Sequence, residues 1–140
     1  FTTSNPSNFE EVTNNIPQLV THKMNDMLLA EFKVEEVENA LQQMAPLKAP
    51  GPNGMPPLFY QHFWPTVKSI VITTALDFLN HGTARAHFHD THIALILKTK
   101  NLESVTDYRP ISLYNVAYKL ASKVVANRMK TILQEIVCEN

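Results

Sequence analysis

Lys98 and Arg109 are the two residues whose types and spacing most directly suggest a chemical task. Ten residues, many of them polar, separate them, and apolar segments that could form strands flank the connection. If the connection folds back as a short β-hairpin-like finger, both cations lie close together at its tip. A lysine ammonium beside an arginine guanidinium could then hold a polyphosphate, whereas two ordinary solvated cations are the alternative interpretation.

Carboxylates offer no comparable group. Glu35, Glu36 and Glu38 are predicted to face water on the outer side of one helix, and the later aspartates are scattered along the chain. Nothing resembles a buried pair that could bind magnesium. The sequence therefore predicts neither catalytic residues nor a metal site in this segment.

Three histidines, His87, His89 and His92, lie within six residues of one another. Such a group could bind zinc if its members shared one face of a strand. No cysteine accompanies them, so a loop that tolerates histidine is the favoured interpretation. A small histidine-metal module remains a third, weaker possibility for the chain.

Charge is divided unevenly along the 140 residues. Residues 1–47 hold two lysines against seven acidic residues, and residues 48–140 hold ten Lys and Arg against six acidic residues, although the whole chain is only −1. This step suggests an acidic lead-in followed by a mildly basic working surface, or simply an uneven surface charge. No apolar run approaches the ~20 residues that span a bilayer, so no membrane partner is expected.

Helices dominate the elements that must position these residues. Helices are predicted within 21–32 and 33–44, over 56–82 as one long helix bent at Pro65, and from Tyr114 to 137. In the last helix one apolar face is expected, roughly opposite Lys119, Lys123 and Lys130. Its members are Tyr118, Ala121, Val125, Met129, Ile132 and Ile136. Residues 1–20 are expected to be extended or loosely ordered.

Strands are few. Residues 91–98 are short and rich in branched apolar side chains, which predicts a well buried strand, and residues 111–113 could form a brief second one. Residues 48–54, KAPGPNG, combine two prolines with two glycines and predict a stiff turn. The fold class is therefore α+β and mainly helical. So few strands, with Phe1 in place of methionine, suggest a segment of a longer polypeptide.

Three stretches in this order resemble the reverse transcriptases of LINE-type (non-LTR) retrotransposons, especially those of plants. They are KAPGPNG, the segment around LILK, and DYRPISLYNVAYKLASKVVANRMK, with FYQHFW and THIALILK as further support. The resemblance runs over nearly all 140 residues. It implies the fingers and the start of the palm of a right-hand polymerase, with 1–47 as an acidic helical lead-in and 48–140 as the N-terminal part of the reverse transcriptase domain.

The resemblance also implies roles for individual cations. Fingers cations of that family contact the triphosphate of the incoming nucleotide, and they match Lys98 and Arg109 here. Lys48, at the start of the Pro-Gly turn, and Lys119 and Lys123, on one face of the last helix, become candidate contacts to template or primer phosphates. An ordinary solvated helix face is the alternative for the two helical lysines.

Enzymes of this family copy RNA into DNA with two Mg²⁺ ions held by palm aspartates. This chain contains neither the first palm aspartate motif nor a Tyr-x-Asp-Asp box, so the segment alone is expected to be inactive. The expected partners are an RNA template, a DNA primer, deoxynucleoside triphosphates and the remainder of the polymerase. The alternative is a non-catalytic, decayed or repurposed remnant that binds nucleic acid or another protein.

Two positions depart from the family pattern. Asn53 stands where the loop motif usually has aspartate, which should preserve the turn while removing one negative charge. Leu97 stands where proline commonly precedes the strand-ending lysine, which could change how Lys98 is presented. Separately, the single Cys138 fits a reducing intracellular compartment, and a nuclear location is expected.

Overall fold

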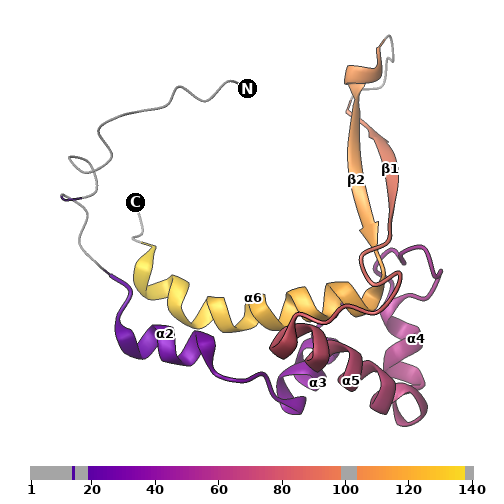
Figure 1. Cartoon of the computed structure of the whole chain (residues 1–140). Coiled ribbons are helices and arrows are strands. Elements are labelled where there is room, and N and C mark those ends of the chain that lie inside the picture. Colours follow the sequence, from indigo (N-terminus) through magenta and orange to yellow (C-terminus); the bar gives the residue numbers. More distant parts are fainter. Residues whose placement is uncertain (1–13, 15–18, 99–103, 138–140) are drawn as a thin grey trace. The chain divides into compact units, whose positions relative to one another are not determined.

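The computed structural model describes residues 14, 19–98 and 104–137. It is α+β and mainly helical with one two-stranded antiparallel sheet, as the sequence predicts (Figure 1). Cys138 and most of residues 1–20 lie outside the described residues. Among the described helices, none combines the length and apolar character needed to cross a membrane. The elements are α2 His22–Leu29, α3 Val34–Gln42, α4 Pro57–His62, α5 Trp64–His81, β1 Thr91–Leu97, η1 Val105–Asp107, β2 Tyr108–Tyr114 and α6 Val116–Ile136.

The chain divides into two compact units. The first comprises Phe1–Ala30 and Met129–Asn140, and the second comprises Glu31–Arg128. In the first unit, Thr21 caps α2 by accepting a hydrogen bond from the Met24 amide at 3.2 Å. All the residues predicted to bind nucleotide or nucleic acid lie in the second unit.

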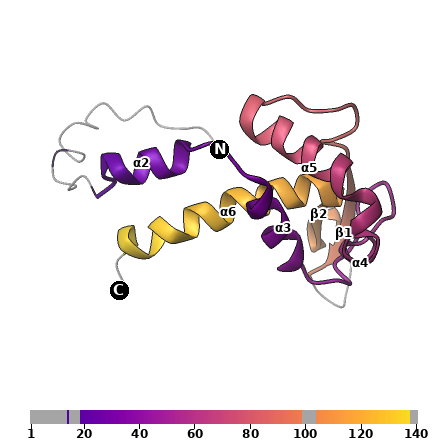
Figure 2. The ribbon, with the colours of Figure 1, turned by 90° about the horizontal axis from the view of Figure 1, so that it is seen from below.

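The core of the Glu31–Arg128 unit is built by α3, α4, α5 and the first half of α6 (Figure 2). Val37 and Leu41 of α3 are fully buried, as is Leu120 of α6. The helical spacing of α3 predicts this face correctly, because its apolar residues recur every three or four positions. The buried residues of the cluster are Val37, Ala40, Leu41, Met44, Tyr60, Val71, Ile72, Ala75, Val116, Leu120 and Val124.

The prediction of one bent helix over 56–82 is wrong, because the structure has two helices. Phe63 separates them with φ −93° and ψ 20°, so the break precedes Pro65. Proline lacks an amide hydrogen and clashes with the carbonyl four residues earlier, but it fits the first turn of a helix, where Pro65 lies. The predicted stop is confirmed: Gly82 ends α5 at φ 67°, and its amide bonds to the Phe78 carbonyl at 3.0 Å.

The hairpin formed by β1 and β2 confirms the predicted finger but corrects its burial. Each strand has seven residues, paired from Thr91↔Tyr114 to Leu97↔Tyr108. Leu95 and Ile96 point to opposite faces of the sheet, since side chains alternate along a strand, yet they are 58% and 48% exposed. The prediction of a well buried strand is therefore wrong. Two strands without a covering layer among the described residues leave both faces open to water.

Helix α6 begins at Val116, two residues later than expected. Its buried stripe in the Glu31–Arg128 unit is formed by Val116, Leu120, Ala121 and Val124. The predicted face is therefore confirmed in part: Ala121 and Ile132 are buried, whereas Val125 and Met129 are 37% and 45% exposed. The partners on α3 and α5, which lie far away in sequence, determine the actual face.

Candidate nucleotide and nucleic-acid interface

The far end of the hairpin brings Lys98 and Arg109 together on neighbouring strands. Arg109 is paired with Ile96 in the ladder, and Lys98 follows two residues later, where its amide donates to the Asp107 carbonyl at 2.7 Å. Cross-strand partners share one face of a sheet, so Arg109 projects on the side of Ile96. The geometry of two cations at one hairpin end is as predicted, and their binding of a triphosphate stays a prediction.

The Lys98 side chain is held across this end. Its Nζ donates to the Thr106 carbonyl at 2.7 Å, within the η1 turn. Ser104 caps that turn, and its own amide donates to the Asp107 carboxylate at 2.9 Å. An ammonium has three donors, so a phosphate oxygen can share Lys98 with the turn. Leu97 is the last residue of β1.

Arg109 is exposed on β2, and Pro110 follows it. Among the described carboxylates, none forms an ion pair with its guanidinium. A planar guanidinium offers a fork of donors that matches two phosphate oxygens. The side chain is therefore chemically available for an anion at the hairpin end.

The Pro-Gly turn is packed directly onto the start of α6. Gly51 is buried, and a Cβ built on it would overlap the backbone of Tyr114 and Asn115. Only glycine lets two backbones approach this closely. The predicted stiff turn is thus a loop anchored on the junction between β2 and α6, where the Asn53–Asn115 bond spans 62 residues of sequence.

Asn53 holds the shape of this loop. Its amide donates to Asn115 Oδ1 at 3.0 Å, its Oδ1 accepts from the Met55 amide at 3.1 Å, and its Nδ2 donates to the Tyr60 hydroxyl at 3.1 Å. The bond to Met55 spans two residues, as in a turn made by an aspartate or asparagine side chain. The expectation that asparagine preserves the turn fits these contacts.

Lys119 lies on this loop rather than on a fully solvated helix face. Its Nζ donates to the Ala49 carbonyl at 2.6 Å, which places the ammonium beside the residue that follows Lys48. Burial and, to a lesser degree, the neighbouring Lys48 ammonium lower the pKa of Lys119. The structure thereby brings two of the predicted phosphate contacts together. Lys123 lies one turn further along α6 and is partly buried.

The histidines do not share one site. His87 adopts φ 63° and bonds to the Asp90 carboxylate at 2.7 Å, while His89 lies among aromatic rings. Among residues 19–98 and 104–137 no three His, Cys, Asp or Glu side chains are close enough to hold a metal ion. The described residues thus give no support to the alternative of a small histidine-metal module.

The view of Glu36 and Glu38 as solvated charges is wrong. Both Glu36 oxygens accept from Arg128, at 2.7 and 2.8 Å, and Arg128 also lies over the Phe32 ring at 3.7 Å. The Arg128 hydrogen bond is the main reason that the pKa of Glu36 lies below its ordinary value. Glu38 accepts from Trp64 and pairs with Lys68. These pairs do not follow from local sequence patterns, because their members are 26 to 92 residues apart.

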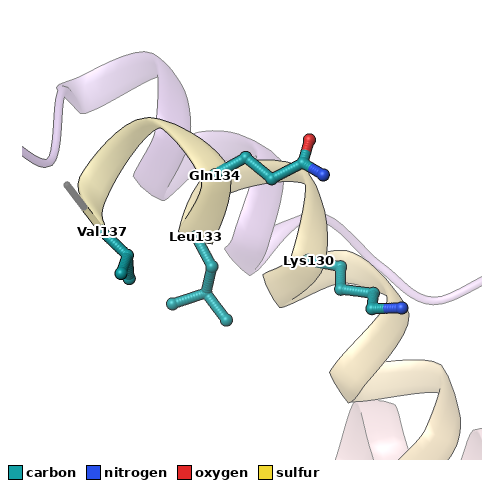
Figure 3. A pocket seen from close by; sticks show the side chains of 4 residues that line it. All are labelled: Lys130, Leu133, Gln134 and Val137. Carbon is teal, nitrogen blue, oxygen red and sulfur yellow. The ribbon is translucent and has the colours of Figure 1, made fainter. Parts of the chain in front are cut away.

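A shallow hollow in the other compact unit contains none of the predicted site residues. Figure 3 shows its lining residues at the end of α6 and directly after it, namely Lys130, Leu133, Gln134 and Val137. All four lie within eight consecutive residues, and only one of them is charged. The hairpin end and the Pro-Gly loop are therefore the better candidates.

Comparison with known proteins adds one informative similarity. The chain is 26% identical over 132 residues to the Transposon TX1 uncharacterized 149 kDa protein of Xenopus laevis. The match covers 94% of this chain and spans about a tenth of the length of that protein. The comparison supports a transposon origin. No protein-family model matches the chain.

Proposed function

We propose that this chain is the fingers and early palm portion of a LINE-type reverse transcriptase, an RNA-directed DNA polymerase acting in the nucleus. One observation carries the proposal: the antiparallel β1–β2 hairpin presents Lys98 and Arg109 at one end. The motif resemblance requires a finger with two cations at this place, and the similarity to a transposon protein is in agreement with it.

In this proposal the hairpin end binds the triphosphate of the incoming deoxynucleotide. Arg109 supplies a bidentate fork, and Lys98 supplies a compact charge whose position is fixed by Thr106. Both groups stabilise negative charge without taking part in bond making. Magnesium, which assists phosphoryl transfer, would be bound by palm aspartates outside these 140 residues.

Template and primer phosphates would be bound at the Pro-Gly loop and along α6. Lys48 and Lys119 meet at the loop, and Lys123 extends the basic surface by one turn. Phosphate contacts of this kind fix position and carry no base specificity. Binding of RNA by the segment alone should be weak and salt-sensitive, since few phosphates are neutralised.

The test uses the parent polymerase with Arg109→Ala and, as a matched control, Arg85→Ala in the exposed loop before β1. Arg109→Ala should raise the KM for deoxynucleotide at least tenfold, about 1.4 kcal/mol, while RNA affinity changes less than twofold. Arg85→Ala should leave both quantities unchanged. An unchanged KM and kcat in Arg109→Ala would overturn the assignment of the hairpin end.

The alternative is a remnant that binds nucleic acid or protein without polymerase activity. Asn53 and Leu97 depart from the family pattern, but Asn53 still makes all three contacts that shape the loop. The discriminating observation is the parent sequence after this segment. An intact aspartate motif and Tyr-x-Asp-Asp box favour the enzyme, and a stop or frameshift favours the remnant.

A further inference from the structure

Five aromatic rings meet beside the start of α6, from three segments far apart in sequence. Phe88 is 6% exposed and forms the centre, with ring centroids 4.8 Å from Phe78, 5.4 Å from His89 and 5.8 Å from Tyr118. Tyr114 belongs to the cluster because its ring contacts that of Tyr118. Phe78 and Phe88 form the less exposed side of this cluster.

The other three rings, Tyr114, Tyr118 and His89, form a more open side that we call the aromatic rim. His89 is exposed, and both tyrosines are partly exposed. Tyr114 and Tyr118 are stacked at 4.5 Å with an angle of 26°, whereas His89 meets Tyr118 edge to face at 5.6 Å. Among the described rings Tyr118 alone contacts Tyr114, so the rim offers ring surface that protein side chains do not fully cover.

The rim adjoins the cationic loop. The Asn115 side chain accepts from the Asn53 amide at 3.0 Å and donates to the His87 carbonyl at 3.4 Å, which ties both loops to the residue after Tyr114. Lys119 follows Tyr118 and bonds to the loop carbonyl beside Lys48. Asp90, the acidic residue next to His89, is engaged by His87.

Beside the rim, the ammonium groups of Lys48 and Lys119 form no ion pair with any of the described carboxylates. Cations that face aromatic ring surface are the combination used to bind single-stranded nucleic acid, since every unpaired base offers a flat face and every nucleotide a phosphate. A duplex offers the phosphates but keeps its bases paired.

We propose that the aromatic rim stacks an unpaired base of a single-stranded nucleic acid whose adjoining phosphate is bound by Lys48 and Lys119. This inference rests on the proposed function, because it specifies how the template strand would contact the segment. Tyr114 is the principal stacking ring because Tyr118 covers one of its faces, and His89 extends the rim on the far side of Tyr118.

The test measures fluorescence anisotropy of a ten-nucleotide single-stranded RNA and of an RNA duplex with the 140-residue chain. Tyr114→Leu should weaken single-strand binding about tenfold and leave duplex binding within twofold. Tyr114→Phe keeps a ring and should bind like the wild type. Phe63→Leu removes an exposed ring outside the rim and is the matched control. The same measurement with single-stranded DNA shows whether the rim prefers the RNA of a template or the DNA of a primer.

A 2-aminopurine in the single strand reports stacking directly, because its emission falls when it stacks on a ring. Quenching by the wild type that is lost in both Tyr114→Leu and His89→Leu is the expected result. If Tyr114→Leu fails to fold, His89→Leu decides alone. Salt-sensitive binding that is equal for single strand, duplex and Tyr114→Leu would overturn this inference only. If the wild type does not bind RNA, or if Lys119→Gln leaves RNA binding unchanged, the proposed phosphate contacts are overturned as well.

Discussion

The Pro-Gly loop and the β1–β2 hairpin each present candidate cations, but they are held in place in different ways. The loop is fixed by a buried glycine, by the Asn53 contacts and by Lys119 on a helix. The hairpin depends on its own ladder, and both of its faces are open. The loop's shape is therefore coupled to the stability of the whole core, while the hairpin can change sequence at little cost.

The same leucine-to-alanine change in both regions tests this contrast most strongly. Leu120→Ala should lower the free energy of unfolding by about 4 kcal/mol, since the side chain is fully buried among α3 and α5 residues. Leu95→Ala, in the hairpin, should cost less than about 0.5 kcal/mol. Urea denaturation followed by circular dichroism measures both. Equal costs would remove the distinction between the two regions.

The next largest effect is expected at Gly51. Gly51→Ala should destabilise by about 3 kcal/mol, because the new methyl group meets backbone rather than a movable side chain. Gly54→Ala is the matched control in the same loop, where φ is 71° but the space is open, and about 1 kcal/mol is expected. Thermal unfolding of both variants gives the comparison. A smaller cost at Gly51 than at Gly54 would contradict the close packing of the loop.

Arg128 and Glu36 should make the helical core sensitive to acid. The pKa of Glu36 is lowered in the folded state, so its contribution is present above its ordinary pKa of 4.5 and is lost as pH falls through the folded value. Arg128→Met should cost about 2 kcal/mol at pH 7 and flatten the decline below pH 4.5.

Glu36→Gln should show the same flattening, measured by urea denaturation at pH 7 and at stepwise lower pH. Glu35→Gln, on the exposed side of α3, is the control and should follow the wild-type curve. A decline that is as steep in Glu36→Gln as in the wild type would exclude this pair as its source.

The smallest effects are expected at Asn53. Asn53→Asp should change stability by less than about 0.5 kcal/mol, because an aspartate can accept from Met55 while the Tyr60 hydroxyl donates to it. Asn53→Ala removes both side-chain bonds and should cost about 1 kcal/mol. Thermal melts of the two variants separate them. A large loss in Asn53→Asp would show that the loop has adapted to asparagine specifically.

Local patterns in the sequence predict much of this fold. The apolar spacing of α3, the glycine stop of α5 and the hairpin between two apolar segments are all found, since each depends on residues close in sequence. Burial of β1 is predicted wrongly because branched apolar residues favour strands whether or not another layer covers them. Pro65 is predicted to bend one long helix but lies in the first turn of α5, because proline can begin a helix as readily as bend one.

The sequence predicts which residues belong to the candidate site better than it predicts the contacts that these residues make. Lys98 and Arg109 follow from spacing, whereas the bond from Lys119 to Ala49 joins residues 70 apart. The aromatic rim also escapes sequence analysis, although His89 and the two tyrosines are visible in the sequence. Only the folding of the 83–90 loop against α6 brings their rings together.

The pairing of α3 with α6 also determines when this core can form during synthesis. Glu36 and Arg128 are 92 residues apart, and Leu120 must arrive before the apolar faces of α3 and α5 can be covered. At a translation rate of ~5–20 residues per second, the α3 face is synthesised roughly 4–17 s before Leu120 and the α5 face roughly 2–11 s before it. During that interval the nascent chain exposes apolar helix faces that favour aggregation, and pausing within codons 82–115 would lengthen this exposure.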